Sequence, residues 1–282
     1  SRQSTNQATS APDFDSGMLK LRAVTAVVLL SVVAAALFLA PASLWSIFCA
    51  AVLVACAWEW GRIAGLSPIA TSLYCGLLLM ALAFVSVGPA LLLNGVLGIG
   101  CLFWWLVVPW WLHQRPRPSR LVLLGCGFLV LVSAVTALQF LRQLGASLLF
   151  AVMAVAWVSD TVAYLAGRRF GRRKLAPAIS PGKTWEGLAA GLIAASVYAL
   201  VIGVEVPHLW LRPVTVINWI VAGLVLAVLG VMGDLFESQL KRVAGVKDSG
   251  KLLPGHGGIL DRVDALLPML PAVAWLALRF GE

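Results

Sequence analysis

Long, uninterrupted apolar runs dominate this chain and decide what it can fold into. Of its 282 residues, 61% are hydrophobic and only 12% are charged. A helix needs about 20 apolar residues to cross the hydrocarbon core of a bilayer, whereas a membrane β-barrel would show short alternating segments. We therefore predict an all-α, polytopic integral membrane protein. The same composition excludes a soluble domain, a disordered chain and a secreted disulfide scaffold.

The polar breaks between the runs divide the chain into nine expected transmembrane helices. Separators such as Pro41 and the Gly88–Pro89 pair are typical of tight turns. Five spans fall in an N-terminal region at 18–145, and the rest in a C-terminal region at 146–282 with polar loops at 167–184 and 236–262. The expected spans are 23–40, 42–58, 66–86, 90–112, 120–140, 146–166, 185–204, 214–235 and 263–280.

The net charge of +9 is explained by the expected membrane topology of the chain. With nine spans, 18 of the 21 Lys and Arg residues lie in loops on the side of the N-terminus. Because basic residues concentrate in cytoplasmic loops, we expect the N-terminus in the cytoplasm and the C-terminus outside. The excess of basic residues therefore does not indicate a nucleic-acid partner, and we expect none.

The N-terminal half offers little chemistry. Residues 1–17 are polar and lack the apolar core of a signal peptide, so we interpret them as a tail or a foreign extension and assign them no function. Glu59 and Arg62, three residues apart near a span end, are interpreted as a local interfacial pair. The five cysteines lie in apolar segments without C-x-x-C spacing, which favours small buried residues over disulfides or zinc ligands.

Two carboxylates stand within or at the end of expected spans, at Asp160 and Asp234. A charged side chain at the centre of a membrane helix costs roughly 2.5–3.5 kcal/mol in insertion measurements, so it normally faces a bundle interior or a wet cavity and has a partner. One interpretation is a structural pair with Lys or Arg. The other is a cation site or a substrate pathway.

Asp261 and Asp264 add two more acids at the start of the last expected span. Their i, i+3 spacing places both on one helical face. Together with Asp234 they would form a cage of carboxylate oxygens, the ligands that Mg²⁺ prefers. Helix capping by Asp261 is the alternative, but a cap does not account for the second acid one turn later.

Basic residues and glycines surround these acids. Lys and Arg neutralise phosphate oxygens, and glycines let the backbone approach a ligand closely. With a metal, this combination suits phosphoryl or nucleotidyl transfer. Two roles are open for His256: it could be a structural hydrogen-bond donor, or it could contact phosphate or carry a proton. The residues are Lys241, Arg242, Lys247, Lys251, His256, Gly257, Gly258 and Arg262.

The earlier polar loop repeats this theme in Ser180-Pro181-Gly182-Lys183-Thr184, directly before an apolar helix. Such a segment could hold phosphate at a helix N-terminus. It is not a P-loop, because residue 177 is proline where that motif needs glycine. The basic cluster at 168–174 is also explained by cytoplasmic retention or by contact with anionic lipid.

These residues carry a resemblance to the phosphatidate cytidylyltransferases, or CDP-diacylglycerol synthases. The family signature S-x-L-K-R-x4-K-D-x-G-x2-L-P-x-H-G-G-I-x-D-R-x-D is matched at every position from Ser238 to Asp264. The resemblance covers about residues 157–264. Upstream, the family pattern is also similar at Asp160–Tyr164, Ser180–Pro181, Lys183–Thr184, Glu186–Gly187 and Gly233–Asp234.

The resemblance implies that CTP and phosphatidic acid react to CDP-diacylglycerol and pyrophosphate, with Mg²⁺ and room for a second cation of unspecified identity. It also implies a homodimer in a bacterial inner membrane, with the active site facing the cytoplasm. The implied catalytic residues are Asp234, Asp261 and Asp264, which would hold metal, together with Lys241 and Arg242. The implied substrate contacts are Ser180, Lys183, Lys247, Lys251, His256, Gly257, Gly258, Arg262 and Asp160.

Two other functions remain open on the sequence. A CTP-dependent lipid kinase would transfer the γ-phosphate and release CDP. A transporter for an anionic substrate would also place acids in spans and basic residues in loops, but it predicts broken helices in both halves. Here the polar residues gather in the second half, which favours an enzyme.

Overall fold

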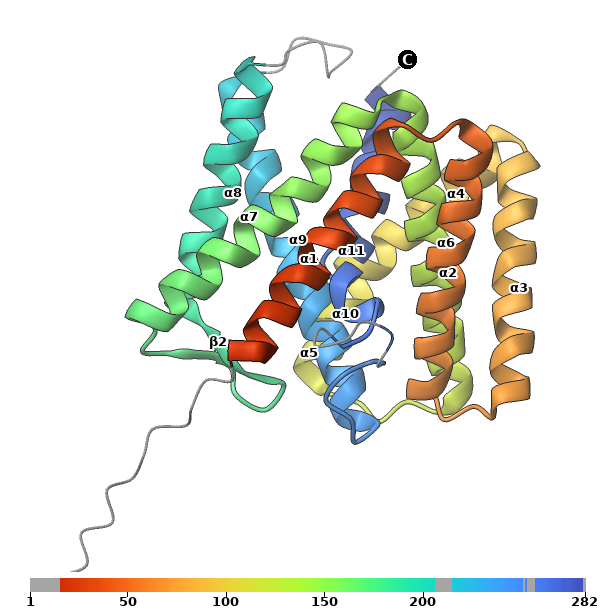
Figure 1. Cartoon of the computed structure of the whole chain (residues 1–282), viewed down its shortest axis with the longest axis horizontal. Coiled ribbons are helices and arrows are strands. Elements are labelled where there is room, and N and C mark those ends of the chain that lie inside the picture. The colour runs from red at the N-terminus through yellow and green to blue at the C-terminus, as the bar shows by residue number, and fades with distance from the viewer. Residues whose placement is uncertain (1–15, 206–214, 251, 253–256, 281–282) are drawn as a thin grey trace, which may run out of the picture.

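The computed structural model describes residues 16–205, 215–250, 252 and 257–280, with side chains for 24–203, 215–250, 252 and 257–279. These residues form a bundle of long helices (Figure 1). Among the described residues, seven helical segments are long and apolar enough to cross a membrane. They are α2 (Ala42–Ile63), α3 (Pro68–Val87), the segment Ala90–Gln114, α6 (Arg120–Leu144), α7 (Ala146–Phe170), α8 (Trp185–Glu205) and α9 (Val216–Val243).

The first and last expected spans correspond to α1 (Ser16–Phe38) and α11 (Leu266–Phe280), whose apolar segments are shorter. Large apolar side chains point outward from the bundle, such as Val87, which is 86% exposed. A soluble protein rarely exposes so much contiguous apolar surface, whereas lipid tails solvate it. The prediction of a helical, polytopic integral membrane protein is confirmed.

The segment Ala90–Gln114 changes its helical pitch in the middle. It consists of α4 (Ala90–Leu102), a π-helical turn η1 (Phe103–Val107) and α5 (Val108–Gln114). The Val108 N–H bonds to the Phe103 carbonyl, five residues back. Pro109 follows at once and has no N–H to donate, which favours an irregular turn at this place.

This turn presents aromatic rings to α9. The Phe236 ring on α9 is 1% exposed and packs edge-on, at centroid distances of 5.5 to 5.7 Å, against three rings from the turn and from α5. Trp60 from α2 adds a fourth, tilted contact at 6.4 Å. The aromatic cluster therefore joins the N-terminal helices to the helix that carries Asp234. The three partners are Phe103, Trp104 and Trp111.

The polar loop expected at 167–184 is partly ordered as a hairpin, which is a local exception to the all-α prediction. Helix α7 continues to Phe170, and β1 (Lys174–Ala176) pairs antiparallel with β2 (Ser180–Thr184). The carboxylate of Glu186 accepts hydrogen bonds from the backbone N–H groups of Arg172 and Arg173. This contact ties the start of the hairpin to the first turn of α8.

The last expected span, 263–280, is wrong at its start. A short helix α10 (Leu260–Val263) precedes α11, and the two are separated at Asp264 and Ala265. On α9, the close approach of Gly233 to this break leaves no room for a side chain, because an added Cβ would overlap the Asp264 carbonyl oxygen. The close contact of α9 with the α10–α11 break thus helps to set the position of Asp264.

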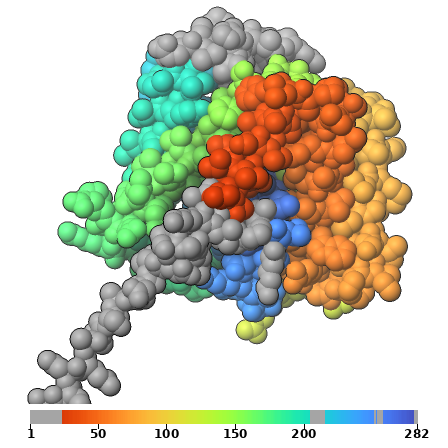
Figure 2. Space-filling view, viewed as in Figure 1, coloured from red at the N-terminus to blue at the C-terminus, as the bar shows by residue number. Residues whose placement is uncertain are grey.

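Figure 1 shows β2, α5 and α10 at one end of the bundle, where α1 also begins, while α11 ends at the opposite end. In the space-filling view of the same face, α1 (red) lies across the front of the molecule (Figure 2), packing against α2 and α7.

Helix α9 has 28 residues, which corresponds to a length of about 42 Å at 1.5 Å per residue. It is longer than a hydrocarbon core of about 30 Å.

Candidate active site

The two polar loops of the C-terminal half meet at the C-terminal part of α9. The Lys183 ammonium on β2 lies 2.5 Å from the Asp234 carboxylate on α9. Eight residues further along α9, the Arg242 guanidinium donates to the Ile179 carbonyl at 3.3 Å. Segments about 50 to 60 residues apart in the sequence are therefore joined by charged side chains from both.

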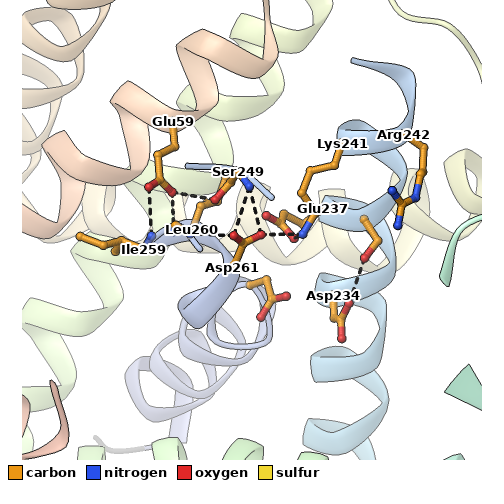
Figure 3. A network of polar contacts seen from close by, with 12 residues as sticks. Glu59, Asp234, Glu237, Lys241, Arg242, Ser249, Ile259, Leu260 and Asp261 are labelled. Carbon is orange, nitrogen blue, oxygen red and sulfur yellow. Dashed lines mark hydrogen bonds and ion pairs between the residues drawn. The ribbon is translucent and has the colours of Figure 1, made fainter. Parts of the chain in front are cut away.

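Lys241 bridges two acids in the interior of this site (Figure 3). Its ammonium lies 2.5 Å from the Glu237 carboxylate, one turn back on α9, and 2.6 Å from the Asp261 carboxylate on α10. Lys241 and Glu237 are both buried. A buried cation between two carboxylates is a strong positional constraint, because removing either partner leaves an uncompensated charge. Lys241 therefore fixes α10 relative to α9.

Asp261 is held from several sides. Besides Lys241, its carboxylate accepts hydrogen bonds from the Ser249 N–H at 3.1 Å and the Gly258 N–H at 2.8 Å. Burial raises the pKa of Asp261, but the Lys241 and Gly258 hydrogen bonds outweigh it and bring the pKa below its usual value. The carboxylate is therefore charged at neutral pH. The backbone of Gly257, with φ of 85°, turns in the left-handed region beside it.

Asp264 has a different environment from Asp261. Burial raises the pKa of Asp264 well above its usual range, and the carboxylates of Asp234 and Asp160 raise it further, while the Ala265 N–H and Lys183 oppose the shift. The structure therefore brings Asp160, Asp234 and Asp264 into one electrostatic group from α7, α9 and the α10–α11 break. A buried carboxyl whose pKa is raised by neighbouring carboxylates is typical of a functional site.

The acids fit a divalent cation in donor type but not in their present arrangement. Carboxylate oxygens suit Mg²⁺, and a cation would relieve the repulsion around Asp264. Among the described residues, however, no three His, Cys, Asp or Glu side chains gather closely enough to hold a metal ion. The Lys183 and Lys241 ammonium groups instead contact Asp234 and Asp261, so a bound cation would have to compete with both lysines.

The structure describes most of the remaining predicted residues. Ser180 is half-buried on β2, and Asp160 is exposed on α7. Lys247 and Arg262 are exposed near the ends of α9 and α10, and Gly258 is buried against Ser249. Lys251 and His256 lie outside the described residues.

Sequence reasoning missed Glu59, and the predicted Glu59–Arg62 pair is wrong. Arg62 is exposed, whereas Glu59 is fully buried and turns toward the segment that carries Asp261. Its carboxylate accepts hydrogen bonds from the Ser249 hydroxyl at 2.7 Å, the Leu260 N–H at 2.8 Å and the Ile259 N–H at 3.0 Å. The available signal was an acid directly at the end of an apolar span.

Comparison with known proteins places this chain in a family. The model of the cytidylyltransferase family matches residues 20–280, nearly the whole chain. The chain belongs to this family. The match begins after the polar N-terminal tail and includes every residue of the site described above.

Two relatives match this chain over most of their length, and a third matches over about half of it. The chain is 37% identical over 276 residues to the phosphatidate cytidylyltransferase of Pseudomonas aeruginosa, covering 92% of this chain and 98% of the relative. It is 33% identical over 278 residues to that of Haemophilus influenzae, covering 90% and 96%. A Bacillus subtilis protein of the same name is 43% identical over 145 residues, about half of each chain.

Proposed function

We propose that this cytidylyltransferase-family protein transfers the cytidylyl group of CTP to phosphatidic acid, forming CDP-diacylglycerol and pyrophosphate. The observation that carries the proposal is the end-to-end similarity to proteins named phosphatidate cytidylyltransferase. The geometry agrees with it: a membrane bundle gathers acids and basic residues from two loops at one end, where a lipid phosphate and a nucleotide could meet.

The proposed reaction is an in-line displacement at phosphorus. A phosphate oxygen of phosphatidic acid attacks the α-phosphorus of CTP, the new P–O bond forms, and the bond to the β-phosphate oxygen breaks to release pyrophosphate. The nucleophile is already anionic near neutral pH, so no strong general base is needed. The chain's task is to orient both phosphates and to neutralise their charge.

Basic residues supply that charge. Arg242, Lys247 and Arg262 are exposed around the centre, and they are proposed to contact the phosphates together with Lys183 and Ser180 from the hairpin. Lys241 is buried between Glu237 and Asp261, so we propose that it acts on the reaction through the position of Asp261. Lys251, His256, Gly257, Gly258 and Asp160 remain predicted substrate contacts.

The proposed metal ligands are Asp234, Asp261 and Asp264, with Mg²⁺ as the cation and a second cation left open. The support is the electrostatic grouping of Asp234 with Asp264 and the Asp261 carboxylate held nearby on α10. A bound Mg²⁺ would supply charge neutralisation at the triphosphate. Binding would require Asp234 and Asp261 to exchange their lysine contacts.

We further propose nine transmembrane helices, a cytoplasmic N-terminus and an active site facing the cytoplasm of a bacterial inner membrane. The distribution of basic residues supports this orientation. So does the position of the start of α1 at the end of the bundle that holds the site, with the end of α11 at the other (Figure 1). A homodimer is proposed from the family resemblance alone.

The two alternatives differ in their products. A lipid kinase would release CDP and leave no cytidine on the lipid, and a transporter would convert neither substrate. The test is purified protein with CTP labelled in the α-phosphate, phosphatidic acid in mixed micelles and Mg²⁺. We expect labelled CDP-diacylglycerol and one pyrophosphate per lipid product. Release of labelled CDP without labelled lipid would favour the kinase and contradict the proposal.

A further inference from the structure

Glu59 is a buried carboxylate that reaches the site from the other half of the chain. It lies near the C-terminal end of α2, 0% exposed, and its partners are 190 to 201 residues away in the sequence. Figure 3 shows Ser249 between the carboxylates of Glu59 and Asp261. A buried charge is costly unless it is fully hydrogen-bonded. The position of Glu59 therefore depends on the groups that donate hydrogen bonds to it.

Glu59 caps the helix that carries Asp261. The first N–H groups of a helix have no partner within it, and a carboxylate that accepts them is stabilising. At α10 the N–H of Gly258 donates to Asp261, while the next two, from Ile259 and Leu260, donate to Glu59. Two carboxylates from distant segments thus share three successive N–H groups.

Ser249 connects the same two carboxylates a second time. Its hydroxyl donates to Glu59 at 2.7 Å and its N–H donates to Asp261 at 3.1 Å. Any displacement of Glu59 therefore acts on Asp261 through Ser249 as well as through the start of α10. The coupling consists of hydrogen bonds from the backbone N–H groups of Ser249 and of residues 258–260, together with the Ser249 hydroxyl.

Two glycines make this approach possible. An added Cβ at Gly250 or at Gly258 would overlap the Glu59 carboxylate. Both glycines belong to the signature segment 238–264. Their lack of a side chain is therefore explained by the packing of Glu59 against the backbone, which places the carboxylate deep within the 249–261 segment.

We infer that Glu59 is a positioning residue for the reaction: it holds the 249–261 segment, and through it the Asp261 carboxylate, in the geometry that turnover requires. Within the described residues, its hydrogen-bond donors are two backbone N–H groups and one hydroxyl, a pattern that fixes backbone rather than pairing a cation. The inference rests on the proposed role of Asp261 in the site.

The decisive variant is Glu59→Gln, which keeps the size of the side chain but turns an NH₂ donor toward groups that are themselves donors. We expect kcat to fall by about 10- to 100-fold, because small misplacements of catalytic groups have effects of this size. The KM for CTP should change by less than about threefold, since a misplaced Asp261 is expected to weaken contacts with the transition state more than the binding of CTP. Amide hydrogen exchange at residues 258–260 should become faster.

If Glu59→Gln fails to fold, a milder variant of a Glu59 partner still tests the inference. Ser249→Ala removes the hydroxyl donor but keeps the N–H to Asp261, and should lower kcat by a smaller factor. Ser133→Ala is its matched control, because Ser133 is equally buried and its hydroxyl donates to Val130 within α6. The control should change neither kcat nor exchange. In the double variant that combines Glu59→Gln with Ser249→Ala, kcat should fall by less than the product of the two single-variant factors.

The exchange measurement needs no turnover, so it separates this inference from the proposed function. Unchanged exchange at 258–260 in both variants would overturn the inference even if CDP-diacylglycerol is formed. Faster exchange with kcat per folded molecule within twofold of the unmodified protein would show a structural contact only, and would also overturn it. Absence of CDP-diacylglycerol synthesis by the unmodified protein would instead refute the proposed function.

Discussion

Asp261 accepts hydrogen bonds from Lys241 on α9 and from the backbone N–H groups of Ser249 and Gly258, which precede α10. Burial raises the pKa of its carboxyl, but the hydrogen bonds from Lys241 and Gly258 outweigh burial and lower the pKa below its usual value. Its charge is therefore matched by groups from different segments of the fold. A neutral isostere at this position would keep the shape while removing the charge that Lys241 and a proposed cation both require.

Asp261→Asn is accordingly expected to reduce turnover by on the order of 100-fold or more, because it removes preorganised charge from the site. The measurement is kcat for CDP-diacylglycerol formation, normalised to folded protein after size-exclusion chromatography. Glu205→Gln, at the far end of α8 from the hairpin, is the matched control and should retain full activity. Near-normal turnover of Asp261→Asn would rule out the proposed metal role.

Lys183→Met removes the ammonium that contacts Asp234 and keeps most of the side-chain stem. Hydrogen bonds to charged groups contribute about 1.5–3 kcal/mol, roughly 10- to 100-fold in a rate constant. We therefore expect kcat/KM for CTP to fall by about this factor. Lys174→Met, an exposed lysine on the same hairpin, should stay within twofold. Equal effects of the two substitutions would argue for general electrostatics instead.

The individual acids show which residues of the site could be predicted from the sequence. Asp160 and Asp234 were indicated by the cost of a carboxylate in an apolar span, and the structure brings both to the site. The same rule applies to Glu59, but Arg62 three residues later offered a local partner. The true donors follow about 190 to 200 residues later, and only the tertiary fold brings them close.

Helix α9 links the aromatic cluster to the acids. Asp234, Phe236 and Glu237 lie within one turn of this helix, and Phe236 packs on rings from η1 and α5. Edge-to-face aromatic contacts contribute beyond the area they bury. The packing of one ring therefore helps to set the rotation of the helix that presents the site.

Phe236→Ala tests this role of packing. Loss of a buried phenylalanine typically costs about 3–5 kcal/mol, so we expect a clear decrease in the thermal unfolding midpoint in detergent. The matched control is Phe84→Ala on α3, because that ring is 66% exposed and faces outward from the bundle. An equal decrease for both variants would show that the cluster adds no specific stability.

The positions of the elements were predictable where the bilayer imposes them. A lipid-exposed segment must satisfy its own backbone hydrogen bonds, so each long apolar run had to be a helix. The hairpin at 174–184 and the separation of α10 from α11 were not predictable in this way. They depend on contacts such as Glu186 with backbone N–H groups and on the close crossing at Gly233.

The two halves of the chain have distinct contributions to one site. The C-terminal half supplies the acids and cations, and the N-terminal half supplies Glu59 and the aromatic rings that pack on α9. The sequence indicated chemistry only in the second half. The first half contributes buried side chains and contacts to backbone N–H groups, and such contacts cannot be recognised from amino-acid composition. Truncation to the C-terminal half would therefore remove the support of the 249–261 segment.

The orientation of the whole molecule in the membrane yields the last prediction. The hairpin and the turn before α4 lie at opposite ends if each long helix crosses once. From the distribution of basic residues we propose that the hairpin lies in the cytoplasm. Ala178→Cys and Ala90→Cys put one exposed thiol at each place, whereas four of the five native cysteines are buried and Cys126 is partly so. The unmodified chain gives the background labelling.

With a membrane-impermeant maleimide added to intact cells freed of their outer membrane, we expect Ala90→Cys to be labelled and Ala178→Cys to remain at background. In inverted membrane vesicles the result should reverse, because the hairpin end then faces the reagent. Labelling of Ala178→Cys from outside intact cells would place the site on the wrong side for cytoplasmic CTP, and the proposed topology would have to be inverted.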